Sequence, residues 1–156
     1  MTCRERLEAY LRAHQVPFQV QHHPVAYTAQ QVAASEHIPG RMVAKVVMVV
    51  ADDRLVLLTL PAPARVDLER VAAMLGARAV RLAHEEEFAA AFSDCEVGAM
   101  PPFGNLYDLP VYADPSLAEN QTIVFAAGTH TDTMSLAYSD FARLVRPVVA
   151  PFAVRT

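Results

Sequence analysis

Lys45 is the only lysine in the chain, against twelve arginines, and it lies within the apolar segment of residues 42–50. An ammonium group buried without a partner is strongly destabilising unless it gives up its proton. A strand that contains such a lysine therefore usually directs it toward an anion, a carboxylate or a water-filled cleft. The alternative is a lysine on the solvent face of a half-buried strand, with its aliphatic stem covering apolar neighbours.

Two loops contain residues that could meet Lys45 in one cleft. Residues 98–104 hold two adjacent prolines between two glycines, and each proline fixes its own φ and restricts the residue before it. Gly128, Thr129 and His130 follow a predicted strand at residues 122–127. Rigid loops positioned by a sheet commonly carry function. The simpler interpretations are a crossover connection for the first loop and a hairpin turn with an exposed histidine for the second.

The sequence lacks the usual motifs of metal sites and of covalent catalysis. His22 and His23 are adjacent, so they point in opposite directions on a strand, and no HxH, HExxH or CxxC occurs. Cys3 and Cys95 lie far apart, which suits a reducing compartment and gives no disulfide framework. We expect Cys3 to lie in a fraying terminus, and Cys95 has no activating motif beside it. We therefore expect no metal, no cofactor and no nucleophilic cysteine.

The composition is that of one globular domain spanning residues 1–156, with 53% hydrophobic and 19% charged residues. The net charge of −4 gives no broad basic face for nucleic acid, so DNA is not an expected partner and any RNA contact must be local or assisted. No apolar run approaches the ~18 residues of a membrane span, and the chain begins with a charged amphipathic segment. We expect a cytoplasmic protein that does not enter membranes.

Local patterns predict the elements that must position these residues. Helices are predicted after the N-caps Thr2, Thr28, Asp67 and Ser139, and one more begins at the acidic run of residues 85–87. Strands are predicted at residues 18–21, 42–50, 54–60, 79–82, 109–113, 122–127, 133–138 and 147–154. Hairpin-type connections dominate, which favours an α+β fold with a mixed, largely antiparallel sheet, curled toward a barrel and flanked by helices.

Five segments with candidate functional residues follow one another along the chain. They are HPVAYT at residues 23–28, Val43-Ala44-Lys45, GAMPPFG at 98–104, LPVYAD at 109–114 and AGTH at 127–130. In this order they resemble the family that contains the YbaK and EbsC proteins and the editing insertion domain of bacterial prolyl-tRNA synthetases, where the third segment matches the family's GxxxP loop. The resemblance extends over most of the chain.

The resemblance implies hydrolysis of mischarged aminoacyl-tRNA, at the ester between a wrong amino acid and the terminal adenosine. Such an ester is labile, so positioning and electrostatics suffice without a covalent nucleophile. It implies that Lys45 holds the terminal phosphate or ribose, that Gly98 brings bare backbone close to the aminoacyl group, and that His130 orients the α-amino group or the attacking water. The substrate-binding residues it implies are Tyr27, Thr28, Met100, Pro101, Pro102, Phe103, Gly128 and Thr129. Met100 departs from the smaller or branched residues expected in that loop, and it either narrows the pocket or packs beneath it.

The partners implied are the acceptor end of a mischarged tRNA and a prolyl-tRNA synthetase or another synthetase. Two other functions fit the sequence. One is a noncatalytic relative that binds tRNA 3′ ends, nucleotides or a synthetase. The net charge of −4 keeps this alternative open, because it disfavours unaided tight tRNA binding. The other is a small-molecule-binding domain with an unrelated ligand. A binder does not need both His130 and Gly98, so their joint presence favours the hydrolase.

Overall fold

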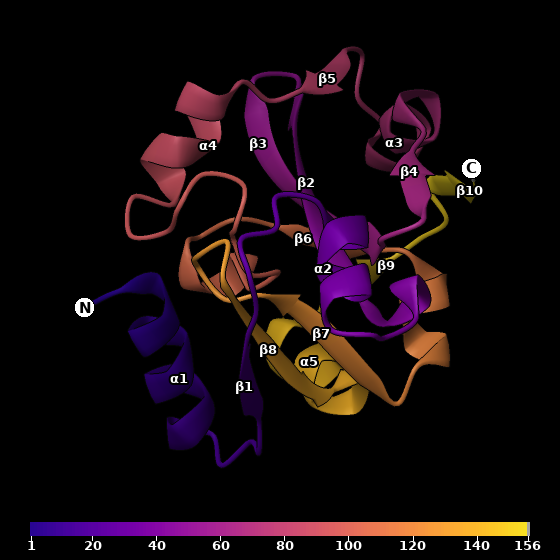
Figure 1. Cartoon of the computed structure of the whole chain (residues 1–156). Coiled ribbons are helices and arrows are strands. Elements are labelled where there is room, and N and C mark those ends of the chain that lie inside the picture. The colour runs from indigo at the N-terminus through magenta and orange to yellow at the C-terminus, as the bar shows by residue number, and fades with distance from the viewer. Residues whose placement is uncertain (156) are drawn as a thin grey trace.

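The computed structural model describes residues 1–155, and its helices and strands are drawn in Figure 1. The α-helices are α1 (Cys3–Ala13), α2 (Ala29–Ser35), α3 (Leu68–Leu75), α4 (Glu85–Ala91) and α5 (Tyr138–Val145). The strands are β1 (Gln19–His22), β2 (Ala44–Ala51), β3 (Arg54–Pro61), β4 (Ala64–Val66), β5 (Val80–Leu82), β6 (Val111–Ala113), β7 (Thr122–Ala126), β8 (Asp132–Ala137), β9 (Val148–Val149) and β10 (Ala153–Arg155). Short 3-10 helices lie at Gly40–Met42, Gly104–Leu106 and Pro115–Glu119.

The strands form three sheets, with the orders β5-β2-β3-β6-β9, β1-β8-β7 and β10-β4. Pairing is antiparallel except for β3 with β6 and β6 with β9, which run parallel. The α+β class and the mixed, largely antiparallel pairing are confirmed, but within residues 1–155 the sheets do not close into a barrel. The outer strands of the largest sheet have only two or three residues, which leaves too short a ladder for closure. A single parallel bridge, Val43 with Val124, joins that sheet to β7.

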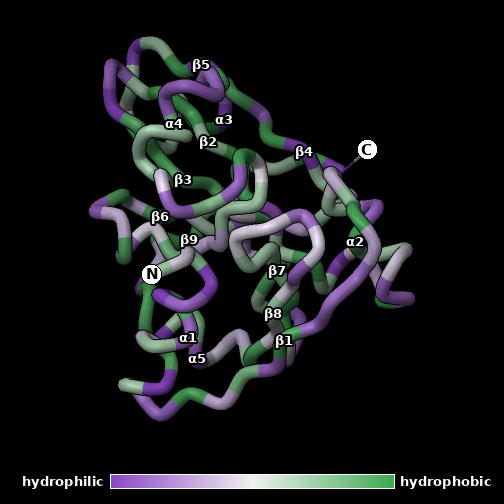
Figure 2. Tube along the Cα trace, turned by 60° about the vertical axis from the view of Figure 1, so that its left-hand side comes forward, coloured by the Kyte–Doolittle hydropathy of each residue, from purple (hydrophilic) through white to green (hydrophobic). Residues whose placement is uncertain are grey.

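The hairpin of β2 and β3 is buried on both faces, which explains its nearly continuous apolar sequence. Met48 and Leu57 face a core completed by α1, α5, β7, β8 and the buried ring of Phe103. Val49 and Leu58 face the opposite way, toward a second core formed with α3 and the C-terminal segment. Figure 2 shows hydrophobic residues along this hairpin and hydrophilic residues on the outer loops. Strands that alternate between two cores have a fixed register, because a slip of one residue would exchange the faces.

The helix ends follow the predicted caps at α1, α2 and α3, but not at α5. Thr2 and Thr28 form capping boxes with Glu5 and Gln31, as predicted. The helix α5 begins at Tyr138, one residue before the predicted cap Ser139, and its N-cap has no side-chain hydrogen bond.

The predicted C-terminal strand is divided into β9 and β10, and β10 pairs with β4, a strand that the sequence did not predict. No helix within residues 1–155 is long and apolar enough to cross a membrane.

Cys3 and Cys95 form a disulfide, contrary to the expectation of no disulfide framework. Their Cα atoms are 5.1 Å apart although 92 residues separate them in sequence, so no local pattern could reveal the pair. Cys3 is also not in a frayed end, because it is only 2% exposed and its N–H donates to the Asp94 carbonyl at 3.1 Å. The bond fixes the start of α1 to the segment after α4.

Candidate functional site

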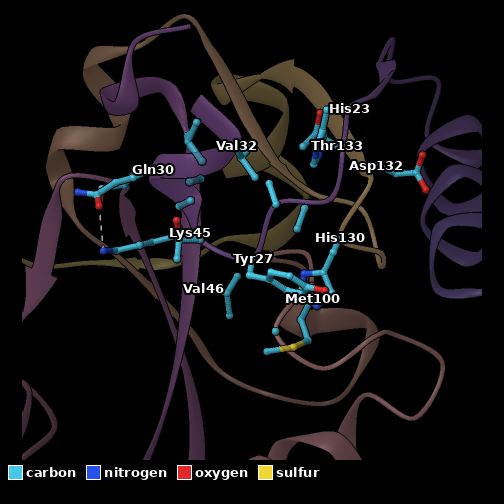
Figure 3. Close-up of a pocket in the computed structure, with 18 of the residues that line it drawn as sticks. His23, Tyr27, Gln30, Val32, Lys45, Val46, Met100, His130, Asp132 and Thr133 are labelled. Atoms are coloured by element: carbon cyan, nitrogen blue, oxygen red, sulfur yellow. Dashed lines mark hydrogen bonds between the residues drawn. The ribbon is translucent and has the colours of Figure 1, made fainter. Parts of the chain in front are cut away.

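A cavity of about 400 Å³ opens between the large sheet and the turn before β8, and Figure 3 shows many of its lining residues. We call it the Lys45 cavity. Its walls come from the loop between β1 and α2, from β2, from residues 62–65, and from two loop segments. These segments are the Gly98 loop (residues 96–99) and the His130 turn (residues 128–131). They come from parts of the chain that are about 30 residues apart and meet only through the fold.

Lys45 lies on β2 opposite Leu60 of β3, with its side chain along the wall of the cavity. Its Nζ donates one hydrogen bond of 3.0 Å to the Ala62 carbonyl. An ammonium has three donors, so two remain for an anion in the cavity. Burial lowers the pKa of the Lys45 ammonium below its ordinary value. This is the desolvated, cavity-facing lysine of the first interpretation and not a lysine on an open solvent face.

Gly98 and His130 are in direct contact on the other side of the cavity. A Cβ atom on Gly98 would lie 3.4 Å from His130 Cε1, and the φ of +86° at Gly98 is one that side chains disfavour. The His130 ring bonds through Nε2 to the Val97 carbonyl at 2.7 Å, and because that carbonyl is an acceptor only, Nε2 holds the proton of the neutral ring. The second ring nitrogen, Nδ1, is then left as an acceptor. The Gly98 N–H makes no hydrogen bond within residues 1–155.

The Gly98 loop and the His130 turn are fastened together by backbone and side-chain hydrogen bonds. The Glu96 N–H donates to the Gly128 carbonyl at 2.8 Å, and the Gly128 N–H donates to the Ala99 carbonyl at 2.9 Å. The His130 N–H donates to the Glu96 carboxylate at 2.9 Å. The backbone and the side chain of Glu96 therefore both hold the turn that contains His130. The position of Glu96 in the sequence did not indicate this role.

Tyr27 stands at the mouth of the cavity, where its ring centroid lies 4.8 Å from that of His130 (Figure 3). The side chain is 70% exposed, an unusual state for an aromatic ring that has no structural role. Its neighbour Val25 is 59% exposed. An exposed aromatic ring beside a polar cavity offers a flat surface for a planar ligand group.

The structure brings seven of the predicted site residues to the cavity wall and places four elsewhere. Those at the wall are Tyr27, Thr28, Lys45, Gly98, Met100, Thr129 and His130. Pro101, Pro102 and Phe103 do not line the cavity, because the chain turns into the core after Met100 and buries them. Gly128 is also buried and lies behind the turn, where a Cβ atom would meet Cys3 at 2.7 Å. Met100 is 5% exposed and combines the two positions considered for it, since it touches both cavity and core.

Five polar residues of the cavity wall were not among the residues predicted from the sequence: His23, Gln30, Arg65, Asp132 and Thr133. The Asp132 carboxylate accepts from Thr129 Oγ1 at 2.6 Å, contacts His22 Nδ1 and lies 3.5 Å from Arg4. Burial acts to raise the pKa of Asp132, but the hydrogen bonds from Thr129 and His22 and the charge of Arg4 outweigh it, so the pKa is lowered. Asp132 thus connects α1, β1 and the His130 turn. The only sequence hint was its position two residues after the candidate histidine.

Within residues 1–155, one group of side chains has the spacing of metal ligands: Cys3, Asp94 and Cys95, whose ligand atoms lie within 4.8 Å of one another. Both sulfurs are joined in the disulfide, so neither is a thiolate available to a metal ion. The group lies behind the His130 turn and not in the Lys45 cavity.

The fold and this cavity define an editing-domain architecture, and sequence comparison identifies the family. A family model described as an aminoacyl-tRNA editing domain matches residues 23–144, and the chain belongs to this family. The resemblance to YbaK and EbsC is thereby confirmed. A search of the curated proteins finds no significant match.

Solved structures show the same fold at low sequence identity. A scaffold protein from a study of epitope grafting by computational design has a TM-score of 0.86 and 20% identity, with 100% of this chain and 99% of that chain covered. A protein described provisionally as a trans-editing enzyme for prolyl-tRNA synthetase has a TM-score of 0.84 and 21% identity, with 99% and 98% covered. A hypothetical protein has a TM-score of 0.85 and 17% identity, with 95% and 99% covered. The agreement over whole chains confirms the fold.

Proposed function

We propose that this protein hydrolyses mischarged aminoacyl-tRNA, cutting the ester between a wrong amino acid and the terminal adenosine. The observation that supports it best is the arrangement of Lys45, Gly98 and His130 around one cavity in a member of the editing-domain family. The three residues supply a cation, a free backbone donor and an orienting imidazole. These are the groups needed to bind a nucleotide end and stabilise attack on an ester.

Lys45 binds the phosphate or ribose end of the substrate. Its ammonium has two donors left after its bond to the Ala62 carbonyl, and a lysine is a suitable point-charge ligand for phosphate. The carbonyl bond fixes the direction of the side chain without neutralising its charge. Tyr27, at the mouth, offers its ring face to the terminal adenine.

The Gly98 loop and the His130 turn act on the ester. The Gly98 N–H is free to donate to the ester carbonyl oxygen, where negative charge develops as water attacks. His130 Nδ1 accepts a hydrogen bond from that water or from the α-amino group, while its Nε2 remains bonded to the Val97 carbonyl. The water needs only to be held in position, because the aminoacyl ester is already activated.

The activity is useful because it removes small amino acids that a synthetase has attached to tRNA by mistake. A synthetase pocket rejects a substrate smaller by one methylene by only about 1–3 kcal/mol, so errors must be removed elsewhere. The net charge of −4 makes unaided tRNA binding weak, which favours action alongside a prolyl-tRNA synthetase or another synthetase. We place this action in the cytoplasm.

The decisive experiment is single-turnover deacylation of a panel of mischarged tRNAs by the purified protein, with and without EDTA. We expect hydrolysis of at least one member of the panel and no effect of the chelator, because the proposed mechanism uses no metal. Binding of the tRNA end without hydrolysis of any member would favour the noncatalytic relative. Inactivation by EDTA would contradict the positioned-water mechanism.

A further inference from the structure

The disulfide lies directly behind the proposed catalytic turn. A second cavity, of about 380 Å³, is lined by both cysteines and also by Gly128 and Thr129 of the His130 turn. The sulfur pair is therefore reachable from solvent by a small molecule, although Cys3 itself is only 2% exposed. The same opening exposes the back of the turn whose front faces the Lys45 cavity.

Cys3 packs against the backbone of the turn without any intervening side chain. A Cβ atom on Gly128 would lie 2.7 Å from Cys3 Cβ and 2.9 Å from Cys3 Sγ, and Gly128 has a φ of +95°. On the other side of the bond, Cys95 is followed by Glu96, which binds the Gly128 carbonyl and the His130 N–H. The disulfide thus links Cys3, which packs behind Gly128, to Cys95, which precedes the residue that binds the His130 turn.

We propose that Cys3 and Cys95 are a redox-active pair that reacts with dithiols, and that the oxidised pair fixes His130 in its working position. The catalytic consequence rests on the proposed function, whereas the structural consequence does not. Neither cysteine touches the substrate, so both act as positioning residues. Reduction would remove the covalent link between the start of α1, which packs behind Gly128, and the residue that precedes Glu96.

The exchange is a two-electron reaction with a dithiol. A thiolate of the dithiol attacks Cys95 Sγ, the more exposed sulfur, and forms a mixed disulfide as the Cys3–Cys95 bond breaks. Cys3 leaves as a thiolate and takes the proton of the second dithiol thiol. That second sulfur then attacks the first sulfur of the dithiol, releasing Cys95, which takes the remaining proton. The protein gains two thiols, and the dithiol becomes a cyclic disulfide.

The surroundings of the pair favour this direction of attack. Cys3 is the first residue of the 11-residue helix α1, whose N-terminal end stabilises negative charge on the leaving sulfur. The Tyr107 hydroxyl lies 3.6 Å from Cys3 Sγ and donates to the Asp94 carboxylate at 2.9 Å, and burial and that carboxylate raise its pKa, so it stays protonated beside the pair. Cys95 Sγ lies 3.5 Å from the Asp94 carboxylate, which can accept a hydrogen bond from the thiol once the pair is reduced.

The test compares the full chain after treatment with dithiothreitol or with oxidised glutathione. Alkylation followed by mass measurement gives the number of free thiols, and amide hydrogen exchange reports on residues 96–99 and 128–131. We expect no alkylation of the oxidised protein, alkylation of both cysteines after reduction, and roughly 10-fold faster exchange in both segments after reduction. Single-turnover deacylation should be roughly 10-fold slower in the reduced protein, because His130 is less well positioned.

The control is the Cys3→Ser, Cys95→Ser double variant. It should match the reduced wild type in deacylation and hydrogen exchange and should not respond to either reagent. Two free thiols after oxidation, or equal exchange in the two redox states, would overturn the inference. A redox effect of equal size in the double variant would also overturn it. Failure of deacylation in both states, with exchange still redox-dependent, would refute the proposed function and support the inference.

Discussion

The two walls of the Lys45 cavity are built in different ways. On one side, Lys45 belongs to a strand that pairs with β3 over eight residue pairs and with β5 on its other edge. On the other side, His130 lies in a turn whose position depends on Glu96, on the Val97 carbonyl and on the disulfide behind it. The first wall is fixed by the register of a buried hairpin, and the second by the turn of the β7–β8 hairpin together with a small number of contacts to the Gly98 loop.

This difference separates the effects expected from substitution. A side chain that projects from a rigid strand can be removed without moving its neighbours, so its loss should affect chemistry and leave stability unchanged. A change in the loop wall alters geometry, and activity and local order should change together. The two walls would not be distinct if a substitution at Lys45 lowered stability, or if a substitution in the loop wall lowered activity without changing local order.

The largest expected effect is that of Lys45→Ala. Removal of the ammonium should lower deacylation by about 10³-fold or more, because the substrate phosphate loses its cation in a partly desolvated site. The fold should keep its stability to within about 1 kcal/mol, since a desolvated charge is removed along with one hydrogen bond. Kinetics and thermal unfolding measure the two quantities, and Lys45→Arg is the control that keeps the charge. A fall of several degrees in Tm would identify a structural lysine instead.

His130→Ala comes next in size and tests the loop wall. We expect deacylation to fall by about 10²-fold, and by no more than ~10⁴, the range for one orienting or acid–base group. Loss of the ring also removes the bond to the Val97 carbonyl, so hydrogen exchange in the Gly98 loop should increase. The measurement is single-turnover deacylation with hydrogen exchange on the same samples. An inactive variant with an unchanged loop would separate chemistry from geometry on this wall too.

Gly98→Ala should have a smaller effect, and Gly76→Ala provides a matched control. Both glycines have positive φ, +86° and +64°, so each substitution should destabilise the fold by about 1 kcal/mol. Only at Gly98 does the added methyl approach His130 and occupy space at the cavity wall. Deacylation should fall by roughly 10-fold in Gly98→Ala and stay unchanged in Gly76→Ala. Equal activity of the two variants would remove Gly98 from the site.

The pH dependence of substrate binding should show the smallest effect. Burial lowers the pKa of the Lys45 ammonium below its ordinary value of 10.5, so its positive charge is lost at a lower pH than that of an exposed lysine. Binding of a tRNA with a non-hydrolysable aminoacyl amide should therefore weaken by roughly 3-fold at alkaline pH, before an exposed lysine would titrate. Lys45→Arg should lack this decline, because a guanidinium stays charged. A decline of the same size in that variant would assign the titration to another group.

The parts of the structure that depend on local patterns were predictable from the sequence. The capping boxes at Thr2 and Thr28 and the hairpin around Lys45 follow from residue types a few positions apart. The Gly98 loop and the AGTH segment were candidates from their prolines, glycines and histidine, and the resemblance to a family supplied their roles. Their meeting at one cavity depends on pairings between distant strands, which no local pattern contains.

Several features that the prediction missed share a physical cause, which is long sequence separation. The Cys3–Cys95 bond, the pairing of β4 with β10 and the attachment of Glu96 to the His130 turn all join segments that are far apart in the chain. Pro101, Pro102 and Phe103 were placed in the site because their neighbours are there. The structure buries them, because apolar residues in a loop next to a core pack into that core.

The bridge between Val43 and Val124 lies where the two walls of the cavity meet. Val43 lies two residues before Lys45, and Val124 lies on the strand that leads to the His130 turn, so this backbone contact joins the two walls. Both valines are buried, at 3% and 5% exposure, and their side-chain volumes act as spacers. Under the proposed function, the volumes of these two valines would help to decide which amino acids enter, Val43 from the cavity wall and Val124 from behind it.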